Sequence, residues 1–342
     1  MGELKRTKEN WVDAVKVFAC ILVVLGHFLQ SMVKSDIIPE THLYGWFNQT
    51  IYYFHVPLFF ICSGYLFQKF TSVGSFGQWK NNFLKKFISL AVPYFVFSLA
   101  TYLMKNVFSD SVNKETGGLI DTLFLNPTSP YWFLYTLIFI FLITITIKSN
   151  RSAVIFAVVA LAIKVASFFI DSNIYALNTV WENEIWFVAG MLICYCDISS
   201  VIERIKIYWG LLISVIFVVV SVIVYRYTEW NDAVAFGMGV LGCTSVLLVA
   251  LTMKLSGNVT DVLSKYTFPV FLMHTIFAAG LRTVLFKFDI SNSVIHIVLG
   301  LIISFIGPVI AAAVLAKLKY TEFLIYPNQF VRIGMKKDEK KT

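Results

Sequence analysis

The stretch that decides the fold is VDAVKVFACILVVLGHFLQSM, residues 12–32, which is long and apolar enough to cross a membrane as a helix. Its polar residues are Asp13, Lys16, Cys20, His27 and Ser31. At about 100° per residue these residues fall within an arc of about 60°, so they share one face of the helix. Ionisable groups at membrane depth are costly unless they face protein, so we expect this face to point into a helical bundle.

The rest of the chain has the same apolar character. Of its 342 residues, 58% are hydrophobic and 14% charged, whereas soluble domains have about 45–50% and about 25%. This composition excludes a disordered, collagen-like or disulfide-stapled protein. It predicts an all-α, polytopic membrane bundle of about ten transmembrane helices. The candidate spans are 12–32, 47–67, 83–105, 130–148, 152–170, 178–196, 207–226, 232–252, 264–286 and 292–316.

The net charge of +8 does not indicate a nucleic-acid partner, because most cations lie at the ends of apolar runs. With an even number of spans, the loops rich in lysine and arginine fall on one side of the membrane. The positive-inside rule then places both termini in the cytoplasm. We expect the membrane to be a bacterial plasma membrane. We therefore divide the chain into a cytoplasmic segment (1–11), a transmembrane domain (12–320) and a basic tail (321–342). The cations predicted to lie on the cytoplasmic side include Lys5, Arg6, Lys8, Lys69, Lys80, Lys148, Arg151, Arg204, Lys206, Lys254, Lys265, Lys317, Lys319 and Arg332.

Three histidines are candidate catalytic residues. His27 lies in the outer half of the first span, and His55 and His274 are expected at a similar depth in the second and ninth spans. Together they could form a buried relay; hydrogen bonding between helices is the alternative role. His42 and His296 give weaker signals. Ser63 and Gly64, beyond His55, are expected to permit close helix packing.

Several cations are candidate ligands for a phosphate group on the cytoplasmic side. Lys16 lies about 16 Å from His27 along the helix axis, and Lys85 and Lys86 open the third span. They could form a cationic mouth for a phosphate-bearing ligand. The alternatives are an interfacial anchor for Lys16 and a topology signal for the lysine pair. Asp13, one turn before Lys16, is expected to orient that lysine.

Aromatic and acidic residues gather at the predicted outer ends of the fourth and sixth spans. Trp132, Glu182 and Glu184 are the candidate substrate-binding residues among them. An aromatic belt explains most such tryptophans; a polar acceptor bound there is the sharper interpretation. Lys164 and Arg282 receive no role from the sequence. The five cysteines lack the spacing of a zinc site or a redox pair, so no metal is predicted.

Five short motifs resemble the acyltransferase-3 family of membrane acyltransferases, and the resemblance covers almost the whole chain. Each motif is weak alone, but all five occur in order on about ten predicted spans. They are Trp11-Val-Asp13-Ala-Val-Lys16 continuing to Val23-Val-Leu-Gly-His27; Phe54-His55-Val-Pro57 continuing to Ser63-Gly64-Tyr65-Leu66; Lys85-Lys86 with Pro93-Tyr94; Tyr131-Trp132-Phe133-Leu134; and Phe271-Leu-Met-His274.

The resemblance implies ten core membrane helices and transfer of an acyl group, often acetyl from acetyl-CoA, to hydroxyls of cell-surface glycans or other small acceptors. It also implies that His27 is the essential histidine and that Lys16 takes the place of a basic partner that is arginine in many members. Lysine keeps the charge but loses the planar two-pronged contact. Members with an additional hydrolase-like domain differ from this chain, which ends soon after the tenth span.

These expectations combine into one mechanism. Acyl-CoA, with acetyl-CoA expected, enters from the cytoplasm with its phosphates near Lys16, Lys85 and Lys86, and His27 acts as general base on an outer hydroxyl acceptor. A covalent acyl-histidine remains a variant. Two other functions stay open: a transporter-like module for a small polar solute such as an amino acid, and a non-catalytic subunit of polysaccharide export. The sequence does not identify the acceptor, the acyl group or the oligomeric state.

Overall fold

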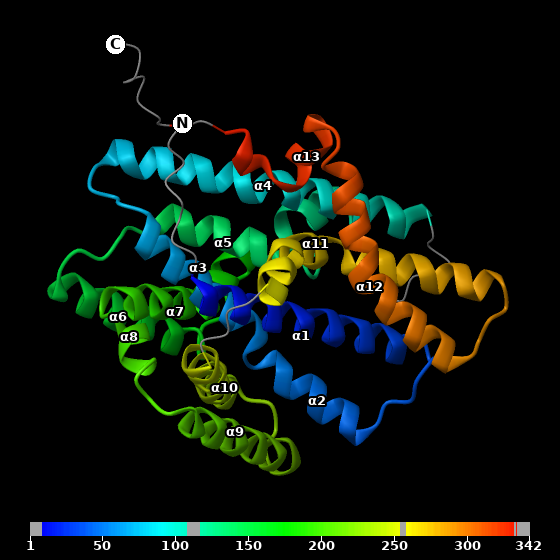
Figure 1. Cartoon of the computed structure of the whole chain (residues 1–342), viewed down its shortest axis with the longest axis horizontal. Coiled ribbons are helices and arrows are strands. Elements are labelled where there is room, and N and C mark those ends of the chain that lie inside the picture. Colours follow the sequence, from blue (N-terminus) through cyan, green and yellow to red (C-terminus); the bar gives the residue numbers. More distant parts are fainter. Residues whose placement is uncertain (1–8, 108–116, 254–257, 332, 334–342) are drawn as a thin grey trace.

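The protein is a bundle of helices (Figure 1). The computed structural model describes residues 9–107, 117–253, 258–331 and 333, and every regular element within them is a helix. The predicted fold class, an all-α membrane bundle, is therefore confirmed. Residues 1–8 of the N-terminal segment and residues 332 and 334–342 of the basic tail lie outside the described residues, and so does Lys254.

Each of the ten predicted spans overlaps one or two helices of the described chain. Seven segments of the described chain are long and apolar enough to cross a membrane, with α2 and α3 counted as one. The number of crossings and the cytoplasmic placement of both termini stay predictions. The helices are α1 (Asn10–Lys34), α2 (His42–Tyr52), α3 (His55–Phe70), α4 (Phe76–Val107), the π-helix η2 (Asp121–Leu125), α5 (Trp132–Ile143), α6 (Asn150–Ala166), α7 (Tyr175–Tyr195), α8 (Ile198–Ile202), α9 (Ile207–Tyr227), α10 (Asp232–Thr252), α11 (Asn258–Lys287), α12 (Ser293–Leu315), α13 (Lys319–Ile325) and the 3-10 helix η3 (Pro327–Gln329).

The second predicted span is interrupted in the structure. Helix α2 ends at Tyr52, and α3 begins at His55. Pro57 is the third residue of α3, where its missing N–H costs no hydrogen bond within the helix. The break places His55 in the first turn of a new helix, beside the end of α2.

The fourth predicted span is shorter than expected. We predicted a helix over 130–148, but α5 ends at Ile143 and the prediction for the residues after it is wrong. The sequence there alternates threonine and isoleucine, and β-branched residues favour an extended backbone. Gln68 on α3 holds the extended segment through two hydrogen bonds with the backbone of Ile147, at 2.8 and 2.9 Å.

Helix α1 lies in the middle of the bundle, where it contacts α2, α3, α10, α11 and α12. Its polar face points into the bundle, as predicted, and Cys20 and Ser31 on this face meet α11. The Cys20 thiol lies 3.5 Å from the backbone oxygen of Thr267, and Arg282 donates to Ser31. The residue numbers of the two contacting pairs increase together along α1 and α11, so the two helices run in the same direction.

Helices α3 and α7 cross at glycines. A Cβ at Gly64 would overlap the carbonyl oxygen of Phe187, and a Cβ at Gly190 would overlap that of Ile61. Only glycine allows the two backbones to come this close. The predicted packing role of Gly64 is confirmed, and its counterpart Gly190 was not predicted.

Contacts between helix ends show which ends lie together. Lys69, near the end of α3, pairs with Glu9, which precedes α1. The indole of Trp79, near the start of α4, donates to the carbonyl oxygen of Leu142 near the end of α5, at 3.1 Å. The first helices therefore alternate in direction, as the predicted arrangement of basic loops requires.

Candidate active site

Three imidazoles from α1, α3 and α11 lie close together, although their residues are far apart in the sequence. The rings of His27 and His274 are 5.5 Å apart between centroids. Tyr52, the last residue of α2, lies between His27 and His55, with ring centroids 6.3 and 4.6 Å from theirs. His55 and His274 are both 1% exposed, whereas His27 is half-buried. The structure thus brings together the three histidines that the sequence singled out.

Backbone carbonyls determine which ring nitrogen carries the proton in two of these histidines. Nδ1 of His274 lies 3.0 Å from the carbonyl oxygens of Val270 and Phe271, and Nδ1 of His55 lies 2.5 Å from that of Ile51. A carbonyl oxygen only accepts, so each Nδ1 donates and each Nε2 keeps its lone pair. Nε2 of His274 is buried and has no hydrogen-bond partner among the described residues. An unprotonated nitrogen therefore lies unsatisfied near His27.

His27 has hydroxyls at both ring nitrogens. The Tyr52 hydroxyl lies 3.5 Å from Nδ1, and the Ser129 hydroxyl lies 3.3 Å from Nε2. Both distances exceed the usual range for hydrogen bonds of this kind, about 2.7–3.2 Å. Catalytic hydrogen bonds are often long before the substrate binds. His27 can therefore exchange a proton with a ligand at Nε2 without first breaking a strong bond.

His27 and His55 line a cavity of about 240 Å³. Its lining comes from α1, α2, α3, α5, α6, α7, α10 and α11, from the segment before α5, and from Tyr53, Ser167 and Trp230, which lie just outside α2, α6 and α10. The lining residues are Val23, His27, Tyr52, Tyr53, His55, Val56, Pro57, Phe59, Ser129, Pro130, Trp132, Phe133, Lys164, Ser167, Glu182, Asn183, Trp186, Trp230, Asp232, Ala235, Phe236 and Phe271.

One end of the cavity is aromatic and charged. Of the three predicted substrate-binding residues, Trp132 and Glu182 line this cavity. Glu184 does not: it is 8% exposed and faces elsewhere from α7, because residues two apart on a helix point about 200° away from each other. Under the predicted orientation this end opens toward the outside of the cell.

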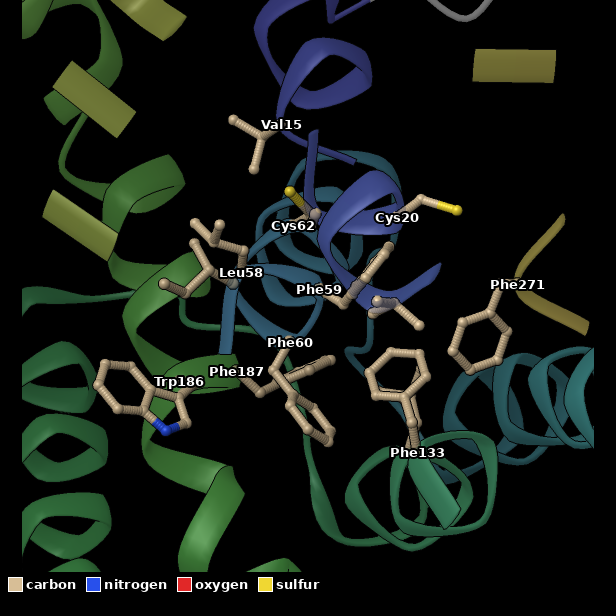
Figure 2. Packing of buried hydrophobic residues seen from close by; sticks show 14 of the residues in the cluster. Val15, Cys20, Leu58, Phe59, Phe60, Cys62, Phe133, Trp186, Phe187 and Phe271 are labelled. Atoms are coloured by element: carbon tan, nitrogen blue, oxygen red, sulfur yellow. The ribbon is translucent and has the colours of Figure 1, made fainter. Parts of the chain in front are cut away.

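The other end of the cavity is closed by apolar rings. Phe59, Phe133 and Phe271 come from α3, α5 and α11, and their centroids are 5.7–6.1 Å apart. Figure 2 shows Phe133 and Phe271 next to each other, within a cluster that extends toward Cys20 and Cys62. With Val23 of α1 these rings form the floor of the cavity, on the side of Lys16.

The predicted phosphate ligands lie outside this cavity. Lys16 and Asp13 are half-buried on α1, close enough to Cys62 on α3 for their charges to act on its thiol. Lys86 lies over the Phe141 ring, 5.1 Å from its centroid, and Lys85 is exposed. The structure therefore places Lys16 beside α3 and Lys86 beside α5, and the common cationic mouth stays a prediction.

Several cavity residues were missed by the sequence analysis. Tyr52 and Ser129, which contact His27, carry no signal in the sequence beyond an aromatic or turn-like context. Lys164 was noted without a role. The free-energy cost of a charged side chain inside an apolar stretch could have indicated that it is functional. Asp232 lies in the first turn of α10, where acidic residues are common, so it gave no sign of a functional role. No group of three or more His, Cys, Asp or Glu side chains in the described part of the chain is arranged to hold a metal ion.

Comparison with known proteins gives one match. The family model described as an acyltransferase domain, Acyl_transf_3, matches residues 9–313. These residues include all three histidines, the cavity lining and the predicted phosphate ligands. No match was found among the curated proteins or among the solved structures.

Proposed function

The chain belongs to the acyltransferase-3 family and is a membrane acyltransferase, and from this premise we propose that it transfers an acyl group from acyl-CoA to a hydroxyl on an extracytoplasmic carbohydrate. The membrane is the plasma membrane of a bacterium, and acetyl-CoA is the expected donor. The observation that carries the proposal is the position of His27, between an aromatic, charged cavity and the helix face that leads back to Lys16.

In the proposed reaction His27 is the general base. Nε2 of His27 takes the proton of the acceptor hydroxyl while the hydroxyl oxygen attacks the thioester carbonyl carbon. The tetrahedral intermediate collapses, the carbon–sulfur bond breaks, and the proton on His27 passes to the departing thiolate. The products are the acylated acceptor and free CoA.

His274 and Tyr52 assist the same proton transfer. The unpartnered Nε2 of His274 supplies a lone pair near His27, which favours the imidazolium that forms when His27 takes the proton. The Tyr52 hydroxyl holds Nδ1 and so directs Nε2 toward Ser129 and the cavity. His55, in contact with the Tyr52 ring, keeps that tyrosine in place.

The acyl donor approaches from the cytoplasmic side. Lys16, Lys85 and Lys86 attract its phosphates, Asp13 orients Lys16, and the pantetheine arm spans the remaining distance to His27. The floor formed by Phe59, Phe133 and Phe271 lies across this route, so the rings must part when the donor binds. Nothing charged has to move with them, because all three side chains are apolar.

Release of CoA tests this proposal. Purified protein is given acyl-CoA and a mixture of glycosides, and the free thiol is followed with a colorimetric reagent. We expect acceptor-dependent release that falls by about 10²–10⁴-fold in His27→Ala, the usual contribution of a general base. His296→Asn is the matched control, because His296 is also buried but bonds Ile290 outside the cavity.

Two results would contradict the proposal. Thiol release that is unaffected in His27→Ala would remove the assigned base. Movement of a labelled polar solute into vesicles without acyl-CoA, together with no thiol release, would favour a transporter instead.

A further inference from the structure

Lys164 has no role in the reaction described above, yet it is an unusual residue. It lies near the end of α6, is 8% exposed and lines the cavity. Its ammonium lies over the rings of Phe168 and Phe236, 5.2 and 5.7 Å from their centroids. Among the described residues it forms neither an ion pair nor a side-chain hydrogen bond. The N–H donors of this ammonium therefore have no hydrogen-bond acceptor among these residues.

Two carboxylates accompany this ammonium at the same end of the cavity. Glu182 on α7 and Asp232 at the start of α10 line the cavity, and their charges act on Lys164. Asp171, outside the lining, acts on Glu182. Glu182 and Asp232 lie beyond ion-pair distance from Lys164, which leaves room for the atoms of a ligand between the three groups. One cation and two anions from three helices thus surround the space.

Flat aromatic surfaces complete this part of the cavity. Trp230 stacks on Tyr53 with centroids 5.4 Å apart and ring planes 10° apart. Trp186 packs against Phe236, and Trp132 also lines the cavity. A sugar ring has apolar C–H faces and a polar edge, so it can meet aromatic rings with its face and charged groups with its hydroxyls.

We propose that Lys164, Glu182 and Asp232 form an acceptor subsite that selects a polyhydroxylated ring without an acidic group. Lys164 donates hydrogen bonds to ring or hydroxyl oxygens, and the two carboxylates accept from hydroxyls. This inference rests on the proposed function, because it names the acceptor class of the same cavity.

Charge explains the selectivity. An acidic ring would bring a third negative charge into a space where Glu182 and Asp232 already accompany the single ammonium of Lys164; like charges at short range inside a poorly hydrated cavity are repelled. An uncharged ring satisfies all three groups without such repulsion. The volume of about 240 Å³ lies below the range for drug-sized ligands, about 300–1,000 Å³, which fits a single ring.

Binding is measured without turnover, so that the result does not depend on the transfer reaction. Tryptophan fluorescence of the purified protein is titrated with methyl hexosides and with the matching methyl hexuronosides, which differ by one carboxylate. We expect saturable binding of at least one hexoside and at least tenfold weaker binding of its uronoside. Lys164→Met should weaken hexoside binding about tenfold. The double variant Glu182→Gln with Asp232→Asn should reduce the ratio of the uronoside and hexoside dissociation constants about tenfold.

Lys34→Met serves as the control, because Lys34 is an exposed lysine at the outer end of α1 and does not line the cavity. Size-exclusion profiles confirm that each variant folds. The proposal is overturned by uronosides that bind as tightly as hexosides, by Lys164→Met that binds like the parent, or by absence of binding for every hexoside. Normal hexoside binding together with no CoA release would retain the subsite and reject the proposed function.

Discussion

At the residue scale, the site is organised around one imidazole. His27 contacts hydroxyls through both ring nitrogens, and a second imidazole with a free lone pair lies 5.5 Å away between ring centroids. The direction of each backbone contact leaves Nε2 unprotonated in His55 and His274. The unprotonated nitrogens of these two histidines therefore lie near His27, whose own Nε2 faces the Ser129 hydroxyl.

Tyr52→Phe tests the role of the hydroxyl at Nδ1. The phenylalanine ring keeps the contact with His55, but His27 loses its hydrogen bond at Nδ1. One hydrogen bond of about 1.4 kcal/mol corresponds to a tenfold lower rate. We expect kcat to fall about tenfold while KM for acyl-CoA is unchanged, measured by thiol release.

Tyr135→Phe is the matched control, because its hydroxyl donates to the carbonyl oxygen of Phe124 away from the cavity. An unchanged kcat in Tyr52→Phe, or an equal fall in both variants, would contradict the positioning role.

The sequence predicts part of this site for a physical reason. Ionisable residues are rare in membrane helices, so His27, His55 and His274 stand out one by one, and their depth follows from helix geometry. Tyr52 and Ser129 do not stand out, since tyrosine and serine are common at membrane interfaces and in turns. Lys164 stands out because a charge in a membrane helix is costly. The acidic residues whose charges act on it lie on α7 and α10, and pairings between distant helices cannot be predicted from one sequence.

At the scale of elements, two local features place the catalytic groups. The break between α2 and α3 brings Tyr52 and His55 to adjacent helix ends, so that their rings meet. The crossing of α3 and α7 then joins His55 to the helix that carries Glu182. Gly64 was recognisable as a small residue in an apolar helix, but the helix it approaches was not.

Gly64→Ala tests the helix crossing. The added methyl group overlaps the Phe187 carbonyl oxygen, which belongs to the backbone and cannot rotate away. Overpacking of this kind costs about 1–3 kcal/mol. We expect a thermal unfolding midpoint in detergent that is several degrees lower.

Gly237→Ala is the comparison, because a Cβ there meets nothing within 4 Å on α10. Alanine favours a helix over glycine by up to about 1 kcal/mol, so this variant should be as stable as the parent or more stable. Equal midpoints for Gly64→Ala and the parent would show that the two backbones can separate at no cost.

At the scale of the whole molecule, the directions of the first helices agree with the predicted placement of the basic loops on one side of the membrane. The hydrogen bonds between Gln68 and Ile147 join the end of α3 to the segment after α5, so the Lys69–Glu9 and Trp79–Leu142 contacts lie at the same end of the bundle, as an alternating chain with basic loops on one side requires. The polar end of the cavity, with Asp232 and Trp230, begins at the opposite ends of α6, α7 and α10. A bilayer around this bundle would separate the predicted donor side from the predicted acceptor side.

Cysteine labelling tests this topology. In a variant without its five cysteines, Ser75→Cys lies in the loop between α3 and α4, and Glu229→Cys lies in the loop between α9 and α10. Both positions are exposed. In intact cells a membrane-impermeant maleimide should label the cysteine at 229 at once and the cysteine at 75 after permeabilisation. The reverse pattern, or equal labelling of both, would contradict the predicted orientation.

The central claim is that the protein, with His27 as general base, transfers an acyl group from a donor on one side of the membrane to an acceptor on the other, and sealed vesicles test it most directly. Inside-out and right-side-out vesicles from the same cells are loaded with the hexoside acceptor and given labelled acyl-CoA from outside. The account predicts labelled hexoside in inside-out vesicles, none in right-side-out vesicles until they are permeabilised, and about 10²–10⁴-fold slower labelling with His27→Ala. Equal transfer in both sealed preparations, or transfer by His27→Ala at the parent rate, would contradict it.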